Sequence, residues 1–131
     1  MKSKFLILED TIASANTSGN GVKWQDGDTY EIIDGTVSCY DPDGAVLADA
    51  PHDDITLEWL IGGDPVATTA EARIPLMALK TLLESPKFRP YELPASKELS
   101  LKAKHTQVTG GTTNNTFPIK VRLMLHLVKK G

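Results

Sequence analysis

The sequence predicts an all-β fold, an antiparallel β-sandwich with one short helical insertion. Several segments alternate between apolar and polar residues with a period of two, which is typical of strands buried on one face. Turn-forming residues separate these segments about every 8 to 15 residues, and strands at that spacing favour a sandwich or a barrel. Helical spacing of apolar residues occurs in one place. We therefore expect about eight strands and one short helix.

The strongest strand patterns lie in the second half of the chain. Apolar side chains occupy every second position of residues 55–61 and 99–104 and of most of residues 117–130, so each segment is predicted to be a strand with one buried face. Residues 29–33 and 36–40 are shorter strand candidates, because they are rich in β-branched side chains.

Clusters of glycine, proline, aspartate and asparagine are predicted to be turns, because these residues tolerate positive φ angles or preset a turn. They are residues 18–21, 25–28, 34–35, 41–44 and 62–65. Residues 107–116 combine two glycines with mostly hydroxyl and amide side chains, which predicts an exposed loop. That loop serves either as a connector or as a contact for a receptor or a neighbour.

The one helical candidate runs from Leu76 to Leu83. Four leucines in this segment have helical spacing, a proline stands at its start, and Pro86 is expected to end it. Beyond it, Pro90 and Pro94 remove two backbone donors, so their segment belongs at a sheet edge or where the chain crosses between sheets.

A chain of 131 residues is long enough to form a single domain over residues 1–131 without metal or disulfide support. The one cysteine, Cys39, lies in a predicted strand and is expected to be a packed thiol. Glu9 and Asp10 interrupt the N-terminal apolar run before a signal-peptide core could form. No apolar run approaches the roughly 20 residues of a spanning helix, so we expect a soluble protein made in the cytoplasm.

Charge is distributed unevenly along the chain, although the net charge is only −3. Residues 1–72 hold 3 Lys and Arg against 14 Asp and Glu, whereas residues 73–131 hold 11 against 3. If each sheet draws strands from both halves, opposite charges lie side by side and largely neutralise one another. Alternatively, the acidic edge of one molecule meets the basic edge of the next in a head-to-tail contact.

The sequence predicts no catalytic, cofactor-binding or metal site. Residues 26–28 and 41–44 are rich in carboxylates but lack the ligand spacing of an EF-hand loop, which favours turns. His52, His105 and His126 show no metal-ligand spacing. A phosphate-binding glycine motif and a nucleophile elbow are both missing from the sequence. We therefore expect a protein that is not an enzyme.

Basic residues of the last two predicted strands are candidates for an assembly surface. They would form one stripe if their strands were neighbours, and such a stripe suits packaged nucleic acid or an acidic subunit. An arginine and a tyrosine beside the proline-rich segment could present a rigid edge to a neighbour. The candidate surface is Arg89, Tyr91, Lys102, Lys104, Lys120 and Arg122.

Four short pieces follow one another in the second half of the chain: Ile74-Pro75-Leu76, Arg89-Pro90-Tyr91-Glu92-Leu93-Pro94, the strand at 99–104, and Val121-Arg122-Leu123-Met124-Leu125-His126. In order and spacing they resemble the C-terminal half of small jelly-roll proteins of bacteriophage virions. Residues 21–30 are similar to the strand and turn that open such domains. The resemblance implies a sandwich of the jelly-roll type.

The same resemblance implies a virion structural protein, either a capsid, minor capsid, vertex or decoration subunit. Its partners would be copies of itself in a homo-oligomer, other virion proteins and, non-specifically, packaged nucleic acid, and it would be located in the virion. The alternative is a module that binds carbohydrate or a host surface, for which Trp24, Trp59 and Tyr40 are the stacking candidates. A cupin-type metalloenzyme would need a histidine cluster that is not evident.

Overall fold

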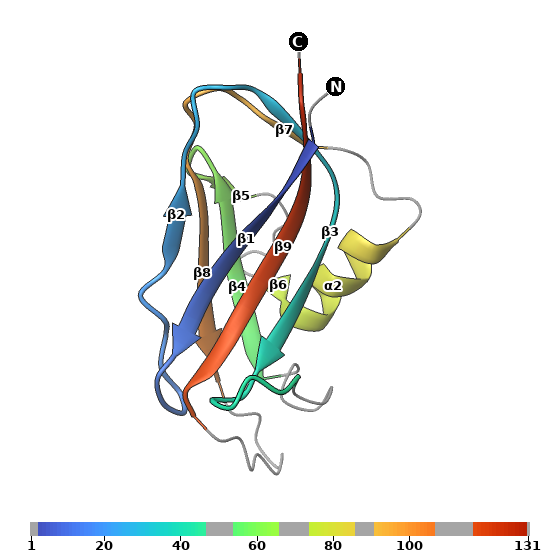
Figure 1. Cartoon of the computed structure of the whole chain (residues 1–131). Helices are drawn as coiled ribbons and strands as arrows, with labels where there is room; N and C mark the ends of the chain where they lie inside the picture. Colours follow the sequence, from blue (N-terminus) through green and yellow to red (C-terminus); the bar gives the residue numbers. More distant parts are fainter. Residues whose placement is uncertain (1–2, 47–53, 66–73, 86–90, 107–116, 131) are drawn as a thin grey trace.

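The computed structural model describes residues 3–46, 54–65, 74–85, 91–106 and 117–130, which form two antiparallel sheets packed face to face (Figure 1). In the first sheet the strand order is β1-β9-β3-β7. In the second the order is β2-β8-β4-β5, and β6 also pairs with β4. The first sheet comprises β1 (Ser3–Ile12), β9 (Ile119–Lys129), β3 (Tyr30–Tyr40) and β7 (Tyr91–Leu93). The second comprises β2 (Val22–Trp24), β8 (Leu99–His105), β4 (Ile55–Ile61), β5 (Asp64–Pro65) and β6 (Ile74–Pro75).

The strand pairs are nested in the sequence. β1 pairs with β9, β2 with β8, β3 with β7, and β4 with the short strands β5 and β6. A long hairpin of this kind, folded over on itself into two sheets, is the jelly roll. The all-β sandwich of jelly-roll type is therefore confirmed.

Alternating side chains build the core between the sheets. All five inward positions of β9, from Ile119 to Leu127, are fully buried, as are Ile55, Leu57 and Trp59 of β4 and the inward residues of β8. Burying one such leucine or isoleucine contributes about 1.5–3 kcal/mol relative to leaving it exposed. The sequence alternation thus predicted these three strands and their inward faces correctly, including that of Trp59, which is fully buried.

Two expectations about the first half of the chain are wrong. Residues 29–33 and 36–40 do not form two strands around a turn, because β3 runs unbroken from Tyr30 to Tyr40. Asp34 and Gly35 lie inside it, next to a register shift between Ile32 and Asp34 that has the character of a β-bulge. The domain also opens earlier than residues 21–30, with β1.

Helix α2 (Leu76–Glu84) lies beside β3, where it covers the part of that strand that β7 does not reach (Figure 1). Its leucines Leu76, Leu79 and Leu83 are buried, which confirms the predicted helix to within one residue. β7 is an edge strand of the first sheet, and the chain then crosses to β8 in the second. The crossing expected near Pro94 is therefore present, whereas Pro90 lies outside the described residues.

Candidate assembly surface

The described residues of the predicted assembly surface do not come together. Lys102 and Lys104 lie on the outward side of β8, in the second sheet, whereas Lys120 and Arg122 lie on the outward side of β9, in the first. These pairs therefore face opposite sides of the sandwich, so the condition for a single basic stripe is not met. Tyr91 is half-buried in β7. Arg89 lies outside the described residues.

Strands from the acidic and basic halves of the chain alternate in the first sheet, where β1 and β3 flank β9. Ion pairs join the two halves within the molecule. Glu9 binds Arg122 at 2.9 Å, Asp28 binds Lys129 at 3.4 Å, and Lys23 binds Glu98 at 3.6 Å. The first two pairs balance part of the sequence asymmetry, whereas the third joins a lysine of the acidic half to a glutamate of the basic half.

Arg122 is held on both sides. Its Nε and Nη2 donate to Oε2 of Glu9 at 3.1 and 2.9 Å, and its guanidinium lies 4.4 Å from the centre of the Tyr40 ring. The hydrogen bonds to Glu9 raise the pKa of Arg122 above its ordinary value. Arg122 and Glu9 therefore form a fixed, nearly neutral unit, while Lys120 makes no ion pair with any described residue.

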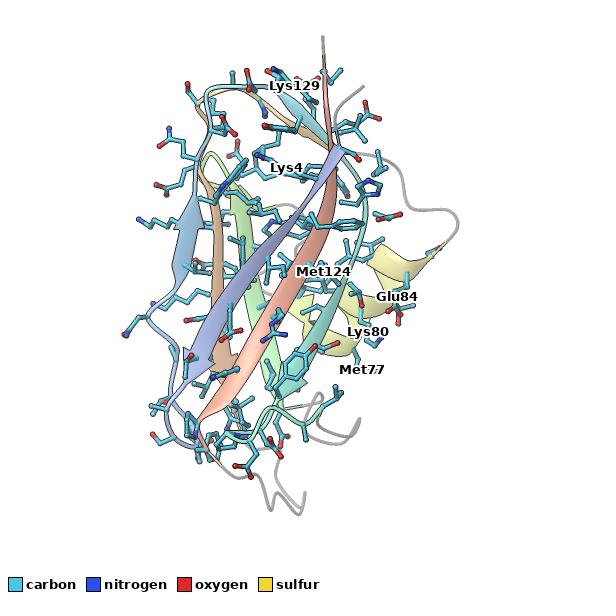
Figure 2. The ribbon with its side chains drawn as sticks, in the orientation of Figure 1. Lys4, Met77, Lys80, Glu84, Met124 and Lys129 are labelled. Atoms are coloured by element: carbon cyan, nitrogen blue, oxygen red, sulfur yellow. The ribbon has the colours of Figure 1, made fainter. Side chains whose placement is uncertain are left out.

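The outward side chains of β1, β9 and β3 lie in register and form a continuous surface, here called the outer face. Its middle is apolar, with Phe5 68% and Ile7 54% exposed, and Met124 lies at its centre (Figure 2). These are two of the three large apolar side chains that are exposed among the described residues. From one end of β9 to the other, its rows are Thr11, Lys120 and Tyr40; Glu9, Arg122 and Ser38; Ile7, Met124 and Thr36; Phe5, His126 and Asp34; Ser3, Val128 and Glu31.

A shallow depression of about 170 Å³ lies on the outer face, lined by Phe5, Asp34, Gly35, Thr36, Met124 and His126. The ring of Phe5 stacks on that of His126 at 4.8 Å between centroids, which holds Phe5 in place despite its exposure. On the far side of β3, Lys80 and Glu84 of α2 border this surface (Figure 2). Sequence reasoning did not identify this face.

At one end of the sandwich, Lys4 enters a cage of aromatic and acidic groups. Its ammonium lies 4.5 Å from the Tyr30 ring centre and 4.9 Å from that of Trp24, and donates to Asp26 at 3.2 Å. The hydroxyl of Tyr30 donates to the same carboxylate at 3.0 Å. Asp26 of the predicted 25–28 turn therefore binds side chains of its own chain. Trp24, a candidate for stacking on a sugar, packs against Lys4.

His105 and Asp54 form a buried polar pair at the other end. Nδ1 of His105 accepts a hydrogen bond from the backbone N–H of Asn16 at 3.1 Å, which assigns the proton to Nε2. Nε2 lies 3.8 Å from Oδ2 of Asp54, and the ring meets Phe117 edge-on at 5.2 Å. Both ring nitrogens thus face protein groups, so this histidine orients the local backbone.

Other chemical candidates are accounted for in the described part of the chain. Cys39 is fully buried, which confirms the packed thiol, and burial raises its pKa to about 12. The described residues contain no cluster of three or more His, Cys, Asp or Glu that could hold a metal ion. Within them, no helix has the length and apolar content needed to cross a bilayer. His52 and the 107–116 loop lie outside the described residues.

The fold and surface together define a jelly-roll β-sandwich that exposes Phe5 and Ile7 on the outward side of β1. Comparison with known proteins finds no match to this chain among family models, curated proteins or solved structures.

Proposed function

We propose that this chain is a structural subunit of a bacteriophage virion that acts through protein–protein contacts. The observation that carries the proposal is the outer face, an ordered sheet surface that exposes Phe5 and Ile7. Adjacent exposed apolar side chains on a β-sheet are characteristic of surfaces that another protein covers. In a virion subunit this face would be a contact between proteins.

The fold agrees with this role, because jelly rolls include viral capsid domains. They also include lectin domains and cupins, so the fold alone does not choose a function. The virion assignment depends in addition on the resemblance of residues 73–131 to small phage jelly-roll proteins. The surfaces available for assembly are the outer face and, on the opposite side, the row of Lys102 and Lys104.

The test is to purify virions of the phage that encodes the chain on a density gradient and to quantify its proteins by mass spectrometry. We expect this chain at a fixed number of copies per particle, retained after nuclease treatment and a salt wash. Its presence only in the unassembled fraction of the lysate would contradict the proposal.

A second candidate is the carbohydrate-binding module, which one specific feature favours. A depression of about 300 Å³ near the β4–β5 turn is lined by Ile61, Gly62, Asp64, Tyr91, Glu92, Pro94 and Lys97. An aromatic ring beside carboxylates is suited to the apolar face and hydroxyl groups of a sugar. Glycan-array binding that Tyr91→Ala abolishes would support this candidate, and the absence of any glycan signal would count against it.

A further inference from the structure

We propose that the outer face binds the outer face of a second copy of this chain. The two copies would be related by a two-fold axis that lies in the plane of the contact, crosses the strands at right angles and passes near Met124. This inference rests on the proposed role in assembly and names the partner. Its basis is the arrangement of charge around the apolar centre.

The apolar centre lies between two charged ends of opposite sign. At one end stands Lys120, next to Arg122, whose charge Glu9 already offsets. At the other end stand Glu31 and Asp34, and beside Glu31 lies the ion pair of Lys130 with Glu92 at 2.9 Å, which leaves this end net negative. The Asp34 side chain is 63% exposed, so its charge is accessible to a partner, and its near neighbour His126 lies 3.6 Å away.

This order of charges makes the surface complementary to itself in one orientation. A two-fold axis across the strands, through the middle row, places the row of Lys120 over the row of Glu31 in the second copy. The same operation places the row of Arg122 over that of Asp34. Since the contact is isologous, each attraction occurs twice.

The alternative two-fold orientation is unfavourable. An axis parallel to β9 and above it would superpose each row on itself, so that Lys120 would face Lys120 and the two Glu31 side chains would lie in the same row of the contact. Like charges placed together cost several kcal/mol, so the charge pattern selects the first arrangement. In that arrangement Ile7 and Met124 meet the same residues of the second copy, and Phe5 lies beside them, over the row of Glu9.

The outward side of the second sheet differs in chemistry. There Glu58 pairs in register with Lys102, and Thr56 with Lys104, so charged and polar residues alternate between neighbouring strands. None of the described residues on that side belongs to the large exposed apolar side chains. The apolar contact is therefore assigned to the first sheet.

The test uses two charge reversals, Lys120→Glu and Glu31→Lys, in the full chain. Alone, each variant places like charges at both ends of the contact, so we expect its dissociation constant for self-association to rise by roughly tenfold or more. Mixed in equal amounts, the two variants restore both attractions, and we expect a mixed dimer with an affinity close to that of the wild type. Sedimentation velocity and native mass spectrometry measure these species.

The matched control is Lys23→Glu on β2 of the opposite sheet, a side chain that is 71% exposed, and it is expected to leave self-association unchanged. A wild-type chain that stays monomeric at every concentration overturns the inference, as does a mixture that associates no better than either variant alone. If the chain does not dimerise but is present in purified virions, the proposed function stands and only this inference is overturned. A dimer with the chain missing from virions would overturn the proposed function alone.

Discussion

Asp10, on β1 of the first sheet, accepts a hydrogen bond of 2.8 Å from the backbone N–H of Ala103, on β8 of the second sheet. The same carboxylate accepts from the N–H of Gly21 at 3.0 Å and from that of Thr11 at 3.0 Å. A side chain on Gly19 would overlap this carboxylate. One buried acidic residue thus joins the two layers of the sandwich and the segment that connects β1 to β2.

Replacing this link is expected to destabilise the protein. Asp10→Ala leaves buried backbone N–H groups without their acceptor, so we expect the free energy of unfolding to fall by about 3 kcal/mol. Chemical denaturation followed by far-UV circular dichroism measures the change. Thr11→Ala, at the exposed neighbouring position, is the control and should change stability by less than about 0.5 kcal/mol. Equal stabilities of the two variants would show that Asp10 does not join the sheets.

The pKa of Asp26 provides a test of the Lys4 cage. Hydrogen bonds from Lys4 and Tyr30 lower the pKa of Asp26 below its ordinary value of 3.8. The carboxylate therefore supports the fold above that pH, and its support is lost as the pH falls through the lower folded-state pKa. We expect Lys4→Met to raise the pKa of Asp26 in an NMR titration of side-chain carboxyl carbons.

Glu84 supplies the internal control for this titration. Its pKa is lowered by Lys80 and Thr36, which bind it at 2.7 and 2.8 Å and which do not contact Lys4. The pKa of Glu84 should be the same in the wild type and in Lys4→Met. An unchanged pKa of Asp26 would contradict the cage.

The Cys39 thiol is expected to be protected in the folded protein. Because burial raises its pKa to about 12, it stays protonated where an exposed thiol, with an ordinary value of 9.0, ionises. The unfolded chain then binds fewer protons than the folded one, so this group lowers stability as the pH rises above 9.0. A thiol reagent should label Cys39 slowly in native conditions and rapidly in denaturant. Equal labelling rates would show that the thiol is accessible.

Gly35 is required by a close approach within the first sheet. A Cβ atom there would lie 2.6 Å from the carbonyl oxygen of Met124 and 2.9 Å from Cδ2 of Leu125. We expect Gly35→Ala to lower the free energy of unfolding by about 2 kcal/mol. Gly27→Ala is the control, because no atom lies within 4 Å of a Cβ there. A thermal melt in which both variants match the wild type would contradict this account of the bulge.

The sequence predicted the fold where the alternation was clean and failed where one residue type serves two purposes. All outward positions of β8 and most of those of β9 and β4 are polar, so the period of two is plain in these strands. Asp34 and Gly35 suit a turn and a bulge equally well, and only the pairing of β3 with β9 decides between them. That pairing joins residues far apart in the sequence, so local propensity cannot predict it.

The outer face was harder to predict for a related reason. Residues 5–8 are apolar on both sides of β1, so the alternation does not show which of them face outward. The basic residues were misplaced because consecutive strands such as β8 and β9 belong to different sheets in a jelly roll. The basic stripe was predicted because its residues are close in the sequence, but the topology places them on two different sheets.

The central claim is that the outer face binds the outer face of a second copy of this chain, and the native mass of the purified chain tests it most directly. Light scattering over a range of concentrations, at low and high salt, should give a two-chain species that Ile7→Asp dissociates without loss of folding. High salt should weaken the charged ends of the contact. A single-chain mass for the wild type throughout, or a dimer that Ile7→Asp leaves unchanged, would contradict the claim.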